Sequence, residues 1–193
     1  LYPYFEKDIA DGTITEEEVI ELLEVHRFKF STIELFASTG ISGGISGNTF
    51  NNLSVGGLDK DGAPCGNRLE WLILHAGMTN QSPQPTLSVL YDERLPKDFL
   101  IKCVECTKTG VGYPAWMNNR VAMDFMMNQY GAEGMTVSEA RAVAIGGCLE
   151  TAPGCFMPLH FNGKTHYIPA GASQTTSVGV HFVSNPKMIN MVL

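Results

Sequence analysis

Apolar positions spaced three to four residues apart, together with cap residues, predict several amphipathic helices. Thr15 and Glu18 form a capping box, and the apolar positions that follow it predict a helix to about Phe30. Thr136 and Glu139 form a second box. The predicted helices cover residues 16–30, 67–77, 97–108 (with Pro96 at the first turn), 117–130 (ending at Gly131) and 136–144.

Short apolar runs bounded by turn residues predict strands between these helices. Residues 86–91 are apolar and lie between Pro85 and Asp92, which is typical of a buried strand. The stretch 40–57 is rich in Gly, Ser and Asn, but interspersed apolar residues predict an ordered loop leading into a strand. Residues 156–161 and 164–168 flank Asn162-Gly163, a strong hairpin signal. Helices alternating with short strands predict an α/β fold.

Composition and charge argue against several classes of protein. The chain has 193 residues, of which 44% are hydrophobic, enough for a substantial core. No apolar run reaches the roughly 18–20 residues that span a bilayer, so we expect no membrane segment. The first ten residues carry charges, which is unlike a signal peptide. A net charge of −7 argues against nucleic-acid binding.

Cysteine usage indicates a reducing compartment. Five cysteines without a secretory signal predict free thiols. Cys103 and Cys106 form a CxxC, but the pair lies in a helical pattern and no second pair exists. We therefore interpret both as core residues, and Cys65 and Cys155 as structural.

Residues 145–155 hold the candidate chemistry. Two glycines follow the predicted helix, then Cys148, then Glu150 two positions on, where alternation puts both side chains on one side of an extended chain. A neighbouring carboxylate disfavours a thiolate, so the pair suits a thiol that exchanges hydrogen atoms, with Glu150 moving a proton. The alternative is a buried structural cysteine after a glycine pair that ends a helix.

Several motifs in order resemble the glycyl radical enzymes, the pyruvate formate-lyase-like family. Gly147-Cys148-Leu149-Glu150 resembles their Gly-Cys-hydrophobic-Glu loop, and residues 55–62 resemble their Gly-Gly-x-Asp-x-Asp-Gly turn. Residues 86–99 and 109–118 resemble the strand, helix and G-x-G-x-P-A-x-x-N segment that follow. The resemblance implies the central portion of a ten-stranded α/β barrel, with the catalytic cysteine on an inner finger loop.

The radical glycine of that family lies near the C-terminus in a motif like Arg-Val-x-Gly-Tyr, which does not occur here before Leu193. We therefore expect residues 1–193 to be an internal fragment of the barrel domain, without the glycyl radical domain and inert alone. The resemblance implies a glycyl radical installed by an activating enzyme that uses S-adenosylmethionine and an iron–sulfur cluster. It implies no metal on this chain, an anaerobic cytoplasm, a homo-oligomer and, in some members, a small iron–sulfur subunit.

Within the family, the motifs look like those of the arylacetate decarboxylases. Pyruvate formate-lyase uses two adjacent cysteines, whereas Gly147 precedes a lone Cys148 here. Diol-type dehydratases carry Pro after the Glu, whereas this chain has Thr151. The decarboxylases convert 4-hydroxyphenylacetate to p-cresol or indoleacetate to skatole. The alternatives are another glycyl radical lyase, such as a diol-type dehydratase, or a non-catalytic α/β ligand-binding module.

The resemblance implies roles for five residues. Cys148 would carry the thiyl radical and Glu150 would be its acid/base partner. His181 matches a histidine near the phenol end of 4-hydroxyphenylacetate, and His160 looks like one in the indoleacetate enzymes, so both substrates stay open. Phe50 is a candidate wall for a flat aromatic ring. By pattern alone, His160 also fits a hairpin surface, and His181 and Phe50 also fit a core.

Overall fold

A three-stranded parallel sheet with alternating helices forms the centre of the chain. The computed structural model describes residues 1–32, 51–146, 150–154 and 156–169. The helices are α1 (Tyr2–Ala10), α2 (Glu16–Ser31), α4 (Arg68–Thr79), α5 (Lys97–Lys108), α6 (Asn119–Tyr130), the 3₁₀ turn η1 (Gly131–Glu133) and α7 (Val137–Arg141). The strands are β1 (Asn52–Gly56), β2 (Thr86–Tyr91), β3 (Ala115–Asn118), β4 (Val143–Gly146), β5 (Glu150–Pro153), β6 (Phe156–Phe161) and β7 (Lys164–Pro169). From β1 to α6 the chain alternates strand and helix, which confirms the predicted α/β class.

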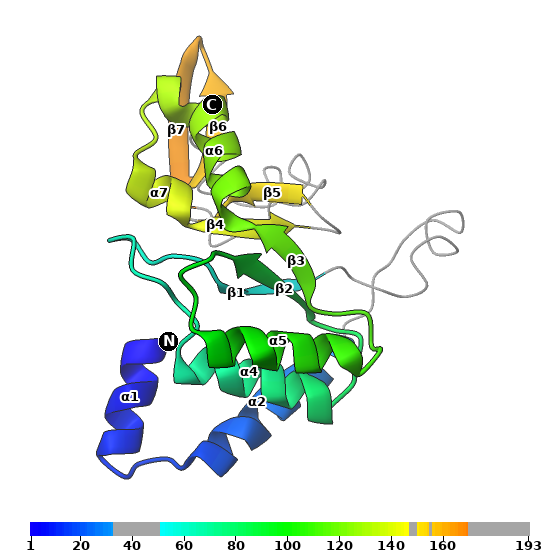
Figure 1. The fold of residues 1–193 in the computed structure, drawn as a ribbon. Helices are drawn as coiled ribbons and strands as arrows, with labels where there is room; N and C mark the ends of the chain where they lie inside the picture. The colour runs from blue at the N-terminus through cyan, green and yellow to red at the C-terminus, as the bar shows by residue number, and fades with distance from the viewer. Residues whose placement is uncertain (33–50, 147–149, 155, 170–193) are drawn as a thin grey trace.

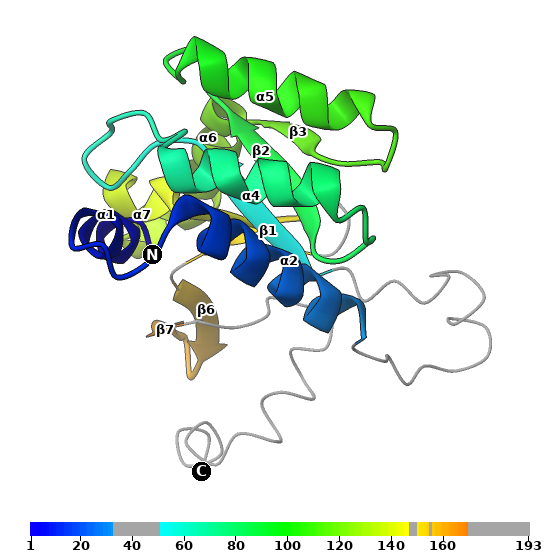
Figure 2. The same cartoon turned by 90° about the horizontal axis from the view of Figure 1, so that it is seen from below.

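The sheet has the order β1-β2-β3, and all of its strands run in the same direction. Val55 of β1 lies opposite Val89 of β2, and Val89 lies opposite Trp116 of β3. Helices α2, α4 and α5 lie side by side as one layer on one side of the sheet (Figures 1 and 2). The β4–β5 pair, α6 and α7 lie on the other side (Figure 1). The sheet is therefore covered on both faces.

Strand β2 is buried on both faces because its side chains alternate between two cores. Leu87 and Val89 pack in the core that includes Phe99 of α5. Leu90 packs in the second core, with Met126 of α6. This double burial explains why the sequence of β2 reads as a continuous apolar run rather than an alternating one.

The helix starts predicted from cap residues are present in the structure. The Thr15 hydroxyl accepts from the Glu18 backbone N–H, while the Glu18 carboxylate accepts from the Thr15 backbone N–H, as predicted. Helix α5 begins directly after Pro96. The thiols of Cys103 and Cys106 are fully buried on this helix, which confirms that they are core residues.

Two predicted helices are shorter than expected, and each gives residues to a strand. The helix predicted over 117–130 begins at Asn119, because Asn118 caps it through the Val121 N–H and Ala115–Asn118 pairs with β2 as β3. The helix predicted over 136–144 ends at Arg141, because Val143–Gly146 pairs with β5 as β4. Helix α1 was not predicted; no side chain caps it, and none of its residues is buried.

The predicted hairpin at residues 156–168 is confirmed. Strands β6 and β7 pair antiparallel, with Phe161 opposite Lys164. Asn162 and Gly163 between them have φ angles of 50° and 68°. Two successive positive φ values define the type I′ turn that Asn-Gly favours.

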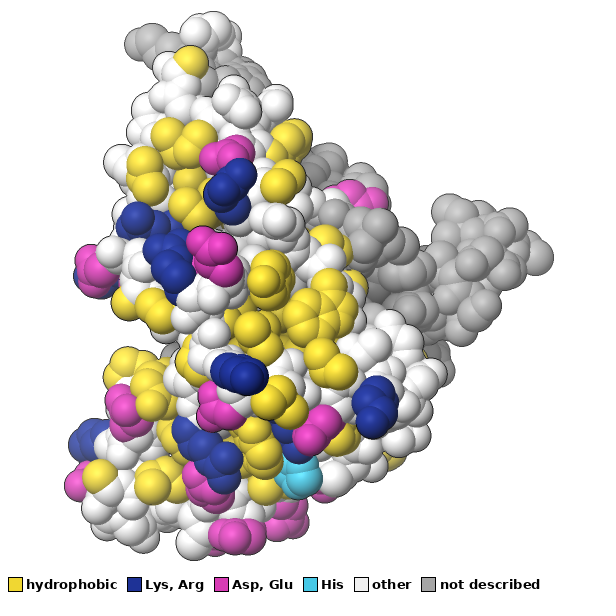
Figure 3. Space-filling view, viewed as in Figure 1, with side chains coloured by type: hydrophobic (Ala, Val, Ile, Leu, Met, Phe, Trp, Pro, Cys, Tyr) yellow, Lys and Arg dark blue, Asp and Glu magenta, His cyan; other side chains and the backbone are white. Residues whose placement is uncertain are grey.

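Exposed apolar side chains gather over α5, β3 and α6, on the face shown in Figure 3. The exposed large apolar side chains of these three elements are Ile101, Val104, Trp116, Val121 and Phe125, and the ring of Tyr91, at the end of β2, lies beside that of Trp116. Apolar patches larger than a few hundred Å² are rare on surfaces that stay in water. No helix of the described ranges is long and apolar enough to cross a membrane.

Candidate active site

The antiparallel β4–β5 pair carries the Cys148 motif. Val143 lies opposite Pro153, and Gly146 lies opposite Glu150, so the two strands are joined by residues 147–149. Cys148 belongs to this connection, which is outside the described residues. A strand, rather than the predicted helix, therefore leads into the cysteine motif, and Glu150 begins the strand that leaves it.

The two faces of this hairpin differ in burial. Val143 and Ile145 are buried in the core formed with Leu90 and α6. Residues opposite each other in an antiparallel pair share a face, and neighbours along a strand alternate. Glu150, opposite Gly146, therefore lies on the other face from Ile145, and it is exposed. The carboxylate is thus presented away from the core, two residues from Cys148.

The other candidate residues are not brought together in the described part of the chain. His160 lies in β6 with its backbone opposite Thr165. Phe50 and His181 lie outside the described residues, as Cys148 does. Among the described residues, no group of three or more His, Cys, Asp or Glu side chains could hold a metal ion.

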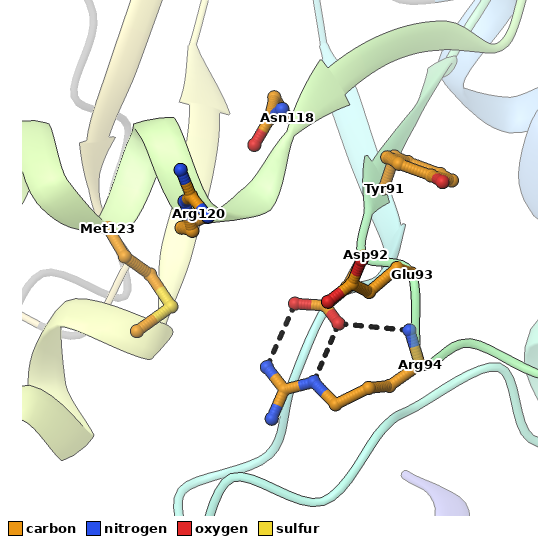
Figure 4. Close-up of a pocket in the computed structure, with 7 residues that line it drawn as sticks. All are labelled: Tyr91, Asp92, Glu93, Arg94, Asn118, Arg120 and Met123. Atoms are coloured by element: carbon orange, nitrogen blue, oxygen red, sulfur yellow. Dashed lines mark hydrogen bonds and ion pairs between the residues drawn. The ribbon is translucent and has the colours of Figure 1, made fainter.

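A pocket of about 380 Å³ lies at the carboxyl ends of β2 and β3 (Figure 4). It is lined by Tyr91, Asp92, Glu93, Arg94, Asn118, Arg120 and Met123. This pocket was not predicted from the sequence. A signal was available, since polar residues directly follow two parallel strands, and ligands of open α/β sheets bind at that edge.

An ion pair dominates the electrostatics of this pocket. The Arg94 guanidinium donates to both carboxylate oxygens of Asp92, at 2.8 and 3.0 Å. These bonds lower the pKa of Asp92 to about 2. The buried Asn119 also donates from Nδ2 to Asp92 Oδ2 at 3.4 Å, while no partner within the described residues reaches its Oδ1. The ion pair lies within the loop that follows β2, and the Asn119 bond joins this loop to the start of α6, just after β3.

A second carboxylate, that of Glu70, holds the end of β1 through backbone hydrogen bonds. Its carboxylate accepts from the backbone N–H groups of Gly66 at 2.5 Å, Asn67 at 3.1 Å and Gly56 at 3.3 Å. Burial raises the pKa of Glu70, and this effect outweighs the lowering by the three N–H donors. Asn67 and Glu70 form a third capping box, so the start of α4 and the end of β1 are held by one side chain.

The sequence profile of the pyruvate formate lyase-like proteins matches residues 1–192. The chain belongs to the pyruvate formate lyase-like family. Over 194 aligned residues it is 61% identical to the 4-hydroxyphenylacetate decarboxylase glycyl radical subunit of Clostridium scatologenes, covering 100% of this chain and 22% of that protein. It is 46% identical to the indoleacetate decarboxylase of Tractidigestivibacter scatoligenes over 151 residues, which is 78% of this chain and 17% of that protein.

A solved structure concerned with 1,2-propanediol dehydration in Roseburia inulinivorans has the same fold. It superposes with a TM-score of 0.75 at 30% identity, over 80% of this chain and 19% of that chain. The likeness confirms the predicted fold as part of a glycyl radical enzyme barrel. The chain spans about a fifth of the length of the proteins it matches.

Proposed function

We propose that the protein containing this chain is a glycyl radical decarboxylase of arylacetates, a carbon–carbon lyase. The observation that carries the proposal is the 61% identity, over the whole chain, to a 4-hydroxyphenylacetate decarboxylase subunit. The hairpin geometry supports it, because an exposed carboxylate begins the strand directly after the Cys148 connection.

In this proposal, residues 1–193 are an internal part of the barrel, and the glycyl radical domain lies elsewhere in the protein. The matched share of about a fifth supports this, since the relatives have much more chain. The exposed apolar face over α5, β3 and α6 also supports it, because further parts of a barrel would cover such a surface.

The reaction replaces a carboxylate by hydrogen, so it needs one proton in total. Cys148 would give a hydrogen atom to the stored glycyl radical and become a thiyl. The thiyl then takes one electron from the bound carboxylate and one proton from Glu150, while the C–C bond breaks and CO₂ leaves. The arylmethyl radical takes the hydrogen atom back from Cys148, which restores the thiyl. Glu150 regains its proton from solvent, in the role of a general acid.

Three further residues would bind the substrate. His181 would lie near the phenol, where an imidazole can donate to or accept from the hydroxyl group. His160 would serve an indole N–H, and Phe50 would stack on the ring. Identity is 61% to the 4-hydroxyphenylacetate enzyme and 46% to the indoleacetate enzyme. The proposed substrate is therefore 4-hydroxyphenylacetate, and the product is p-cresol.

The proposal includes an activating partner and an anaerobic setting. A glycyl radical would be installed by an enzyme that uses S-adenosylmethionine and an iron–sulfur cluster. The word "subunit" in the relative's name supports a small second subunit, which we propose to contain an iron–sulfur cluster. The enzyme would be a homo-oligomer in an anaerobic cytoplasm, and this chain would bind no metal.

Product analysis tests the proposal. The full-length protein is activated anaerobically and given 4-hydroxyphenylacetate or indoleacetate. We expect p-cresol from the first, no turnover in Cys148→Ser, and retained turnover in Cys65→Ser. Activity in Cys148→Ser, or neither p-cresol nor skatole from the activated wild type, would refute it.

A diol-type dehydratase is the second candidate, favoured by the TM-score of 0.75 to the propanediol dehydration structure. A dehydratase would convert 1,2-propanediol to an aldehyde and leave both arylacetates unchanged. The same assay therefore separates the two functions.

A further inference from the structure

The turn that follows β1 offers two backbone carbonyls to side chains from elsewhere in the chain. Asp59 fixes its shape, because Oδ1 accepts from the backbone N–H groups of Asp61 at 2.9 Å and Ala63 at 2.8 Å. Gly62 has a φ of +88°, which favours glycine. Residues 59–62 are called the Asp59 turn below.

Two arginines donate to the Asp59 turn. Arg141 Nη1 donates to the carbonyl oxygen of Lys60 at 2.7 Å. Arg94 Nη1 donates to the carbonyl oxygen of Gly62 at 3.4 Å. A Cβ on Gly62 would lie 2.9 Å from Arg141 Nη2, so the guanidinium lies closely against the glycine. The contact thus depends on the absence of a side chain at position 62.

Arg141 is also the last residue of α7, immediately before the hairpin that carries Cys148. The carbonyl oxygen of Ala142, the next residue, accepts from the Gly154 N–H at 2.5 Å. Val143 then begins β4, opposite Pro153 of β5. Both strands of the hairpin are therefore tied to the chain beside Arg141.

We infer that Arg141 is a positioning residue for the radical reaction of the proposed function. A two-stranded hairpin is marginally stable by itself, so its placement depends on its anchors. One anchor is the burial of Val143 and Ile145, which holds the hairpin against the core. Burial is non-directional, so it resists sliding along the strands weakly. The directional bond from Arg141 to the Asp59 turn fixes β4 along the strand direction relative to the sheet, and so the place of Gly146 and Glu150, the two residues that flank the cysteine motif.

Kinetics of the activated full-length enzyme test this role. A misplacement of about 1 Å can lower a rate about 10²-fold, so we expect Arg141→Met to lower kcat at least tenfold while KM changes less than about twofold. Arg141→Lys keeps one donor and should recover part of the loss. Arg68→Met is the matched control, because it removes an exposed arginine contact to Glu16 away from the hairpin.

A kcat for Arg141→Met equal to that of Arg68→Met would overturn the inference. If Arg141→Met does not fold, Gly62→Ala displaces the same guanidinium without removing its charge. We then expect a lower kcat with KM retained, and an unchanged kcat in Gly62→Ala overturns the inference.

Alkylation of Cys148 in the unactivated protein separates this inference from the proposed function. The rate of its reaction with iodoacetamide, followed by mass spectrometry, needs no substrate. We expect Arg141→Met to change that rate more than threefold relative to wild type and Arg68→Met. If the wild type is inactive on arylacetates but Arg141→Met changes the alkylation rate, only the proposed function is refuted. If Arg141→Met leaves the alkylation rate unchanged, the positioning role is refuted.

Discussion

Arg27 Nη2 donates a 2.7 Å hydrogen bond to the hydroxyl of Tyr113, and the guanidinium carbon lies 4.8 Å from the centre of the same ring. Arg27 is only 2% exposed. Three further N–H groups of the guanidinium donate to backbone carbonyls, those of Asn80, Ser82 and Pro85. One buried cation therefore joins α2 to the loop before β2 and to the residue preceding Pro114, close to β3.

Replacing Arg27 by methionine should destabilise the protein strongly. The apolar stem is retained, but the three carbonyls and the Tyr113 hydroxyl lose their donor in a buried site. We expect a loss of about 3 kcal/mol. The measurement is the thermal midpoint of the full-length protein, together with hydrogen exchange of the α2 amides. Tyr113→Phe removes one hydroxyl and should cost about 1 kcal/mol. Equal losses of stability in the two variants would show that the three carbonyl contacts of Arg27 contribute nothing beyond the Tyr113 bond.

The Asp92–Arg94 pair predicts a pH-dependent contribution to stability. The pKa of Asp92 is lowered from 3.8 to about 2, chiefly by the Arg94 hydrogen bond. A lowered folded-state pKa means that the contribution is present above about pH 4 and is lost as the pH falls toward 2. The shift corresponds to at most about 2.5 kcal/mol. Because Arg94 is half exposed, we expect about 1–2 kcal/mol.

Asp92→Asn is the variant that measures this contribution. The stability difference from wild type should be largest near pH 7 and should fall by about half near pH 3. Thermal unfolding at both pH values gives the comparison. A difference that stays constant, or grows on acidification, would show that the carboxylate is not stabilised by Arg94.

Alanine variants of Gly57 and Gly110 can be compared to separate the cost of backbone strain from the cost of close packing. Both have positive φ, +74° and +79°. A Cβ on Gly57 would lie 3.2 Å from Leu90 Cβ and 3.3 Å from Asn119 Oδ1, whereas a Cβ on Gly110 would meet nothing within 4 Å. Gly110→Ala should therefore cost about 1–2 kcal/mol from the left-handed backbone alone.

Gly57→Ala should cost a further 1–3 kcal/mol or so, because the new methyl group overpacks a buried site. Thermal midpoints of the two variants give the difference directly. If both variants lose the same stability, the carboxyl edge of the sheet is looser than the contacts of Gly57 indicate.

Local signals decide which elements could be predicted from the sequence. Strand β2 and helix α5 were predicted at their observed bounds, because Pro85, Asp92 and Pro96 mark their ends. The last two residues of β3 and the first two of β4 were predicted as parts of helices. Each strand has four residues, too few to show a period of its own. Their apolar residues adjoin a helical pattern, and only pairing with β2 or β5 distinguishes them.

Local signals also decide which residues of the candidate site could be predicted. Cys148 and Glu150 could be proposed from the sequence because they lie two residues apart in one motif, and their roles stay predictions. The bond from Arg141 to Lys60 joins residues 81 positions apart, so no local pattern indicates it. The Asp92 pocket also needs the parallel pairing of β2 and β3 before its residues meet.

Glu150 gives the sharpest functional prediction, because Glu150→Gln keeps the size of the side chain and removes its proton exchange. Glu150 begins β5 on the exposed face of the hairpin, so the substitution fills no core space. A lost general acid typically lowers the rate by roughly 10²- to 10⁴-fold, and we expect kcat for p-cresol formation to fall by that factor. Quench-flow or endpoint product analysis of the activated full-length enzyme measures it.

The control for Glu150→Gln must separate proton transfer from radical loss. Electron paramagnetic resonance counts the stored radicals, and we expect equal numbers in wild type and Glu150→Gln, because in the proposed function the carboxylate acts after the radical is installed. Asp124→Asn, an exposed carboxylate on α6, should retain full turnover. Turnover of Glu150→Gln within threefold of wild type at equal radical content would mean that the proton comes from another group. A fall in radical content in proportion to turnover would instead assign Glu150 to radical storage.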